Sequence, residues 1–158
     1  MSLHPSNEAA EPLSKTRLRL WLRLLKASRQ IEDQVRRKLR EDCGTTLPRF
    51  DVMSVLYRHP EGLKMNRIAD LLRVANGNIT GIVDRLTADG LALRVAVPGD
   101  RRANLVRLTP TGITSFEAQA ANHEDWIDEM LTDLNRDDLD GMIQRLDQLL
   151  DTLEEAQT

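Results

Sequence analysis

Aromatic residues and cysteine are scarce in this chain of 158 residues. Aromatic side chains make up only 3% of the sequence, so a hydrophobic core has to be built mainly from aliphatic side chains. The single cysteine, Cys43, excludes an internal disulfide framework and favours a reducing compartment. No apolar run approaches the length of a membrane span, and the first residues lack the basic and apolar segments of a secretory signal. We therefore expect a cytoplasmic protein.

Groups that could support catalysis or hold a metal ion are also few. His123 and Glu124 begin a zinc-binding helix motif, but Ile127 stands where the second histidine ligand would be needed. The acidic segment 136–147 departs from a calcium-binding loop at its first and twelfth positions, and it fits the acidic start of a helix better. The sequence shows no convergent nucleophile and base. We therefore expect a protein that is not an enzyme and that has no metal site and no cofactor.

Charge is distributed unevenly along the chain. The formal net charge is -3 overall. Residues 64–107 nevertheless hold eight cations and four anions, a local charge of +4, which leaves -7 for the rest of the chain. A cationic segment on an acidic body can contact phosphate groups although the total charge is negative, because local charge governs the contact.

Hydrophobic spacing predicts a mainly helical chain. Residues 1–12 are polar and non-periodic, and they are predicted to form a mobile tail. A helix of some thirty residues is predicted from 13 to 42, long enough to reach beyond the core of one subunit. Further helices are predicted at 49–58, at 65–72, around 79–86, from 110 to 131 and from 136 to the end. Thr109 and Asn135 are suitable N-caps for the last two helices.

A β-hairpin is predicted after these short helices. The apolar, β-branched runs 91–97 and 105–109 flank Pro98 and Gly99, which favour a turn. The tip then carries Asp100, Arg101 and Arg102. Arginine is attracted by the negative potential of a narrow minor groove, and Asp100 can orient a neighbouring guanidinium. The alternative is that the two arginines only keep the tip soluble; the carboxylate between turn and arginines favours insertion into a groove.

The segment before the hairpin has the two faces that a DNA-reading helix needs. Ile79, Ile82, Val83 and Leu86 are predicted to face inward, whereas Asn76, Asn78, Thr80 and Gly81 face outward near the N-terminal end. Asparagine can form two hydrogen bonds with adenine, and a threonine methyl can contact the methyl group of thymine. A solvated helix surface is the alternative. Because the hairpin follows directly, the pattern favours a winged helix-turn-helix.

These residues resemble the MarR family of bacterial transcription regulators. The resemblance is carried by the segments 76–86 (NGNITGIVDRL), 89–91 (DGL) and 100–112 (DRRANLVRLTPTG), and it extends in helix order over nearly the whole chain. It implies a homodimeric winged helix-turn-helix protein, usually a repressor of a nearby operon. It also implies that terminal helices form the dimer interface and that small molecules, often phenolic or otherwise aromatic, bind between that interface and the reading head.

The expected fold is therefore mainly α with a small β-hairpin wing. After the tail, residues 13–158 are predicted to form a single MarR-like unit. Its DNA-binding part is 44–109, and its dimerisation part combines 13–43 with 110–158. Dimerisation has independent support, because Leu146, Leu149, Leu150 and Leu153 form a surplus apolar stripe that needs a partner surface. Packing against the first helix of the same subunit is the alternative.

The resemblance also implies roles for individual residues. Asn76, Asn78, Thr80 and Gly81 occupy the contact positions of the reading helix, Arg101 and Arg102 occupy the wing tip, and Asp100 orients a wing arginine. Two positions depart from the family pattern. Ala75 stands where a serine or threonine cap is common, so Asn76 is a candidate cap in its place. Gly81 stands where a basic residue is common, which removes a contact.

A small effector is expected to lower the affinity for DNA. The segment 76–81 resembles members of the family that respond to aromatic acids or their coenzyme A thioesters. Residues that could line its pocket are Arg17, Trp21, Phe50, Met53 and Tyr57, for which core packing or plain exposure is the alternative.

Some relatives of the MarR family sense oxidants through a cysteine near the start of the first helix. Cys43 lies at the opposite end, so we expect an inert thiol.

The function expected from these observations is sequence-specific DNA binding by a transcriptional regulator. We expect a repressor that is released by an aromatic acid or an acyl-CoA-like effector. The alternative function is a helical protein–protein interaction module without DNA-binding activity, in which the hairpin is only structural.

Overall fold

The computed structural model describes residues 10–158, apart from the side chains of residues 101–103. This part of the chain folds into six helices and one antiparallel sheet of three strands, which confirms the expected fold class. It divides into two compact units, the first ending at Gln119 and the second running from Ala120 to Thr158. The first unit contains the whole predicted DNA-binding part.

Helix α1 (Leu13–Cys43) confirms the long first helix. It ends at Gly44, whose left-handed backbone (φ 62°) lets its N–H donate to the Leu39 carbonyl. Only Val35 and Leu39, both near the C-terminal end, are buried. The first turns carry apolar side chains that are each more than half exposed, namely Leu13, Leu18, Leu20, Trp21 and Leu22.

Helix α2 (Leu47–Tyr57) starts two residues before the predicted boundary. Thr46 is the N-cap, because its hydroxyl accepts a hydrogen bond from the Arg49 N–H at 3.3 Å. Pro48 lies in the first turn, where its missing N–H costs no helical hydrogen bond. This cap was not predicted, because the expected helix began only at residue 49.

The core of the first unit lies between α2, the two helices that follow it and the sheet. Helix α3 (Met65–Leu72) and helix α4 (Asn76–Ala88) form the predicted helix-turn-helix. The largest fully buried side chains are almost all aliphatic, as the shortage of aromatic residues requires: Leu39, Val52, Met53, Leu56, Ile68, Ile79, Val83, Leu86 and Val106. Burying each contributes about 1.5–3 kcal/mol relative to exposure.

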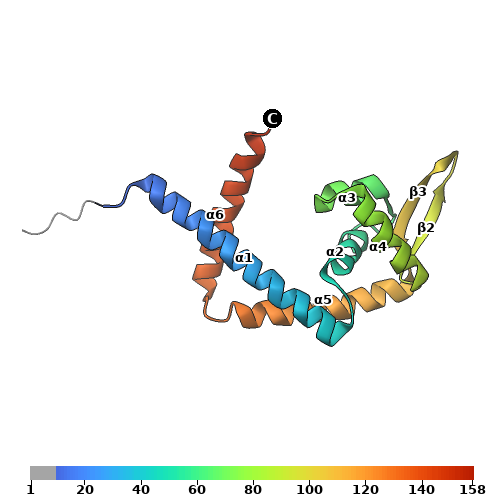
Figure 1. The fold of residues 1–158 in the computed structure, drawn as a ribbon, viewed down its shortest axis with the longest axis horizontal. Helices are drawn as coiled ribbons and strands as arrows, with labels where there is room; N and C mark the ends of the chain where they lie inside the picture. Colours follow the sequence, from blue (N-terminus) through green and yellow to red (C-terminus); the bar gives the residue numbers. More distant parts are fainter. Residues whose placement is uncertain (1–9) are drawn as a thin grey trace, which may run out of the picture. The chain divides into compact units, whose positions relative to one another are not determined.

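The sheet has the strand order β1-β3-β2. Strands β2 (Ala92–Val97) and β3 (Asp100–Leu108) form the predicted hairpin around the turn at Pro98 and Gly99, and Figure 1 shows it extending away from the short helices. Strand β3 begins at Asp100, five residues before the predicted start, so the segment expected to be a tip is largely strand.

Strand β1 (Leu63–Lys64) was not predicted, because two residues are too short to show alternation. It pairs with β3, with Leu63 opposite Val106. Gly62 precedes it with a φ of 100°, and a Cβ at that position would lie 3.0 Å from the Leu105 Cβ. A glycine is therefore needed for the chain to approach β3 so closely.

Helix α5 (Pro110–Met130) begins as predicted. The Thr109 hydroxyl accepts a hydrogen bond from the Gly112 N–H at 3.0 Å and donates one to the Gly90 carbonyl at 2.7 Å. Gly112 packs directly on the chain after α4, since a Cβ there would lie 1.9 Å from the Leu91 carbonyl oxygen. The Thr-Pro-x-Gly motif thus fastens the start of α5 to the end of α4 and the start of β2.

The second unit contains the end of α5 and helix α6 (Arg136–Glu155). Asn135 is the predicted N-cap and forms a capping box with Asp138, each side chain accepting a backbone N–H of the other residue. None of the α6 side chains is buried. Its apolar stripe, exposed in the single chain, consists of Met142, Ile143, Leu146, Leu149, Leu150 and Leu153.

Candidate nucleic-acid interface

Helix α4 presents the two faces that the sequence predicted. Ile79, Val83 and Leu86 are buried, and Ile82 is half-buried. The four residues of the expected contact face are all exposed: Asn76, Asn78, Thr80 and Gly81. An exposed polar strip of small side chains at the N-terminal end of a helix is suited to the major groove.

The expectation that Asn76 caps α4 is wrong. Ala75 is the N-cap and provides no side-chain hydrogen bond, and Asn76 is the first residue of the helix. The Asn76 carbonyl instead accepts a hydrogen bond from the Thr80 hydroxyl at 3.2 Å. The helix thus begins without a side-chain cap because alanine has no polar atom, and the Asn76 amide is not used for capping.

Two ion pairs fix α4 within the first unit. The Arg94 guanidinium on β2 pairs with the Asp84 carboxylate on α4. The Arg49 guanidinium on α2 donates to the Asp89 carboxylate, just after α4, at 2.6 Å. Neither pair was predicted from the sequence, because the partners are ten and forty residues apart in the chain. Together they hold the helix against both the wing and α2.

The wing places its charged segment at the start of β3. Asp100 lies opposite Val97, directly after the turn, and it is exposed. The side chains of Arg101 and Arg102 lie outside the described residues, so their contact with a groove stays a prediction. A register shift between Ala96 and Val97 interrupts the ladder just before the turn.

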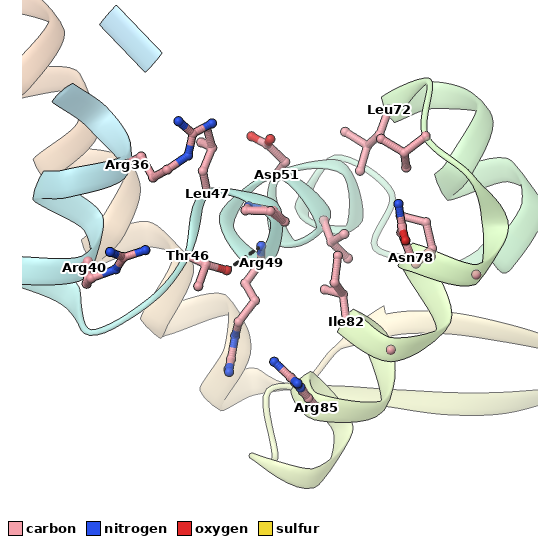
Figure 2. Close-up of a pocket in the computed structure, with 16 residues that line it drawn as sticks. Arg36, Arg40, Thr46, Leu47, Arg49, Asp51, Leu72, Asn78, Ile82 and Arg85 are labelled. Carbon is pink, nitrogen blue, oxygen red and sulfur yellow. Dashed lines mark hydrogen bonds between the residues drawn. The ribbon is translucent and has the colours of Figure 1, made fainter. Parts of the chain in front are cut away.

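A cavity of about 720 Å³ lies in the first unit beside α4. Figure 2 shows that α1, α2 and α4 surround it, and that arginines from all three helices line it. They are Arg36 and Arg40 on α1, Arg49 on α2 and Arg85 on α4. Asn78 and Gly81, two of the four expected DNA contacts, also belong to its lining. This cavity was not predicted from the sequence.

Asp51 is the one carboxylate among the residues lining that cavity. Burial raises the pKa of the Asp51 carboxyl, the Glu32 carboxylate raises it further, and the Arg36 guanidinium opposes both effects. The cavity therefore combines four cations with a single, half-buried acid, and its lining carries a formal charge of +3.

The five residues expected to contact an effector lie elsewhere, because none of them lines this cavity. Phe50 and Met53 are buried, whereas the side chain of Trp21 is 56% exposed and that of Arg17 is also exposed. Tyr57 is 42% exposed; its ring lies 4.9 Å from that of Phe116. Its hydroxyl donates to the Glu117 carboxylate at 3.0 Å, and this hydrogen bond raises the pKa of Tyr57.

Neither a membrane-spanning helix nor a cluster of metal ligands is present in the described part of the chain. Within residues 10–158, no helix combines the length and the apolar character that crossing a membrane requires. The described part of the chain also contains no group of three or more His, Cys, Asp or Glu side chains placed to hold a metal ion. Cys43, the last residue of α1, is half-buried.

Comparison with known proteins identifies the family. A family model described as MarR family matches residues 44–103, the segment from the end of α1 into the wing. The regulator MhqR of Bacillus subtilis is 30% identical over 128 residues, which cover 81% of this chain and 87% of that protein. The chain belongs to the MarR family.

Two further similarities extend over nearly the whole chain. A MarR family transcriptional regulator from Silicibacter pomeroyi has a similar crystal structure, with a TM-score of 0.75 and 28% identity, covering 90% of this chain and 99% of that one. The activatory protein BadR of Rhodopseudomonas palustris is 26% identical over 94% of this chain and 86% of its own length.

Family membership settles the general function. This MarR-family protein is a DNA-binding transcriptional regulator, and the regulators of this family are not enzymes. The alternative of an interaction module without DNA-binding activity is therefore rejected. The exposed strip on α4 and the adjacent hairpin stay the predicted elements of DNA contact.

Proposed function

We propose that this MarR-family protein acts as a homodimer on a pseudo-palindromic operator. There it represses transcription until an aromatic acid or an acyl-CoA-like effector releases it. The observation that carries the proposal is the exposed polar N-terminal strip of α4, which three buried aliphatic side chains hold next to the wing. Two such heads related by symmetry would contact half-sites about 10 base pairs apart.

Direct contacts to DNA are assigned to two elements. On α4 they are Asn76, Asn78, Thr80 and Gly81, and on the wing they are Arg101 and Arg102, with Asp100 orienting a wing arginine. The exposure of the α4 residues supports the first group. The Thr80 methyl is available for an apolar contact, because its hydroxyl bonds back to the Asn76 carbonyl. Gly81 lets the helix backbone approach the bases closely.

Dimerisation is assigned to segments 13–43 and 110–158, and DNA binding to segment 44–109. The exposed apolar residues on the first turns of α1 and along α6 support the assignment, since monomers rarely expose so much apolar surface. Helix α6 buries none of its residues in the single chain, although it carries seven large apolar ones, six of which are exposed. A second copy of this chain is the partner that symmetry makes available.

The effector is assigned to the surroundings of Arg17, Trp21, Phe50, Met53 and Tyr57. Tyr57 supports an aromatic ligand, because its partly exposed ring already packs at a tilt against Phe116, and aromatic ring pairs contribute about 0.5–1.5 kcal/mol. Arg17 is an exposed guanidinium that can pair with a carboxylate.

Fluorescence anisotropy with the promoter DNA beside this protein's own gene tests the proposal. The DNA should bind in a salt-dependent manner, and a scrambled duplex of equal length should bind at least 1,000-fold more weakly at physiological salt. Adding aromatic acids and, separately, their coenzyme A thioesters should raise the Kd.

A reporter gene behind the same promoter should be silenced by the protein. Activation of the reporter would contradict repression. That outcome has to be measured, because the similar protein BadR is named as a transcriptional activatory protein.

A further inference from the structure

Helix α5 passes from the first unit into the second. Residues 110–119 belong to the first unit, which carries the proposed reading face, and the helix continues to Met130 in the second unit, which carries the apolar stripe of α6. We propose that Tyr57 and Glu117 are positioning residues, whose hydrogen bond fixes the rotation of α5 on α2 and thereby sets the spacing of half-sites that a dimer accepts. This inference rests on the proposed homodimer and its pseudo-palindromic operator.

The first turns of α5 are attached to the first unit along one row of buried residues. Gly112, Phe116 and Gln119 are buried, and their spacing of four and three residues places them on one face of the helix. At the start of the row, a Cβ on Gly112 would lie 1.9 Å from the Leu91 carbonyl oxygen. A single row of contacts fixes the position of the helix axis, but it resists rotation about that row only weakly. A contact beside the row is needed to fix the rotation.

Glu117 provides a contact beside the row, because it lies about 100° around the helix from Phe116. Its carboxylate accepts a hydrogen bond of 3.0 Å from the Tyr57 hydroxyl on α2. The centroid of the Phe116 ring lies 4.9 Å from that of Tyr57 and 5.4 Å from that of Phe50. Phe50 and Tyr57 are two turns apart on one face of α2. The row of buried residues and the hydrogen bond together hold α5 in one rotational setting on that face.

The hydroxyl of Tyr57 is not required for core packing. Tyr57 is 42% exposed and Glu117 is exposed as well, so both partners of the hydrogen bond are accessible to water. A hydrogen bond to a carboxylate is charge-assisted and directional. At an exposed position such a bond adds little to the free energy of unfolding, but it still selects one orientation of the two helices.

Helix α2 connects this contact to the reading face. Near its N-terminal end, Arg49 donates a hydrogen bond of 2.6 Å to Asp89, just after α4. Buried side chains of α2 and of α4 also belong to the core of the first unit. The reading face therefore moves with α2, and α2 is joined to α5 by Tyr57 and Glu117. A rotation of α5 on α2 would thus move the reading head of each subunit.

The spacing of the half-sites reports on this rotation. Each base pair added between two half-sites turns one relative to the other by about 36° and moves it by about 3.4 Å. Two heads with a fixed setting accept one spacing, whereas two heads that can rotate on α5 also accept the neighbouring spacings. A loss of stability, in contrast, weakens binding by the same factor at every spacing.

Fluorescence anisotropy on the full chain without effector tests the inference. The probes are duplexes of equal length that carry the site bound in the promoter DNA beside this protein's own gene, with its natural centre or with two base pairs added or removed there. The spacing preference is the Kd for an altered duplex divided by the Kd for the natural one, and it should be about tenfold for the natural chain. Tyr57→Phe and Glu117→Met should each lower it about fivefold, because one net hydrogen bond per subunit is lost.

Three further variants separate the hydrogen bond from other effects. Glu117→Gln keeps an acceptor oxygen and should keep the spacing preference within about twofold of the natural one. Glu129→Met removes the same charge from an exposed position on the same helix and should leave the preference unchanged. The double variant Tyr57→Phe/Glu117→Met should show no lower preference than either single variant, because both remove the same interaction.

Amide hydrogen exchange of the free chain provides a readout that needs no DNA. Tyr57→Phe and Glu117→Met should raise the exchange rates of the α5 amides after residue 113 by about fivefold, because this part of the helix is held less firmly on α2. Glu117→Gln and Glu129→Met should leave these rates close to those of the natural chain.

Equal weakening at all spacings would show that the Tyr57 hydroxyl contributes only to stability, and it would refute the inference. An unchanged spacing preference in Tyr57→Phe and Glu117→Met, or a Glu117→Gln variant that behaves like Glu117→Met, would refute it as well. In each of these cases the natural chain still prefers one spacing, so the proposed function stands. If the natural chain binds no duplex, or binds every spacing alike, the proposed function fails, and the exchange rates alone then decide the role of Tyr57 and Glu117.

Discussion

The Arg94 guanidinium on β2 pairs with the Asp84 carboxylate on α4, so the wing and the DNA-facing helix are joined by a direct electrostatic contact. Both side chains are substantially exposed, and an exposed ion pair contributes only about 0.2–1 kcal/mol to stability. We expect its value to lie in orientation, because in the proposed function the helix and the hairpin contact two grooves of one duplex at the same time.

Breaking this pair should affect DNA binding more than folding. Arg94→Met keeps the length of the side chain and removes its charge; we expect a loss of operator affinity of about five- to tenfold, with a thermal midpoint within about 3 °C of the natural one. Asp84→Asn should have a similar effect, and the double variant should be little worse than either single variant. Additive losses in fluorescence anisotropy would show that the two residues act independently.

Replacing Gly112 should destabilise the first unit strongly. In Gly112→Ala the new Cβ would lie 1.9 Å from the Leu91 carbonyl oxygen, so the backbone has to move. We expect a loss of about 2–4 kcal/mol in the free energy of unfolding, measured by urea denaturation. Gly141→Ala is the control, because its Cβ meets nothing within 4 Å and alanine favours helix by up to about 1 kcal/mol. Equal stabilities of the two variants would refute the close contact.

Removing a wing arginine should weaken operator binding in a salt-dependent way. If the Arg102 side chain neutralises one phosphate, Arg102→Ala should make the slope of log K against log salt shallower by about 0.9. Arg145→Ala on α6 is the control and should leave both affinity and slope unchanged. An unchanged affinity for Arg102→Ala in an anisotropy titration would remove the wing from the mechanism.

The Asp51 carboxyl should make the protein slightly less stable as the pH rises. Burial raises the pKa of Asp51 in the folded state above its ordinary value of 3.8, so the folded protein holds the proton more tightly than the unfolded chain does. The folded protein therefore loses stability when Asp51 ionises. This loss in the free energy of unfolding is absent well below pH 3.8 and complete above the raised pKa. Asp51→Asn should therefore raise the thermal midpoint at pH 7, by on the order of 1 °C for a half-exposed group, and have no such effect near pH 3. A lower midpoint at pH 7 would mean that the electrostatic attraction between the Asp51 carboxylate and Arg36 outweighs burial.

Local sequence signals predicted most of the helical architecture. Thr109 and Pro110 start α5, Asn135 caps α6, and the 3–4 spacing of apolar residues placed α3 and α4, because each of these effects acts within one or two helical turns. Asn76 shows the limit of such signals. An asparagine beside an alanine is the better cap by residue type, yet the helix begins one residue too early for it to serve.

The candidate site was predicted only where it depends on one helix. The periodicity of α4 was enough to separate Asn76, Asn78, Thr80 and Gly81 from the buried side chains. The arginine-lined cavity was missed because Arg36, Arg49 and Arg85 come from three helices that are distant in the chain. Nothing in the spacing of those residues indicates that they surround one space.

The sequence by itself determined the order of the elements, the exposed polar strip of α4 and membership in the MarR family, because periodicity, capping and motif are properties of neighbouring residues. Only the tertiary structure decided the two-residue strand β1, the ion pair of Arg94 with Asp84, the close packing of Gly112 and the cavity beside α4. Each of these depends on which distant segments meet, and that depends on how the whole aliphatic core packs.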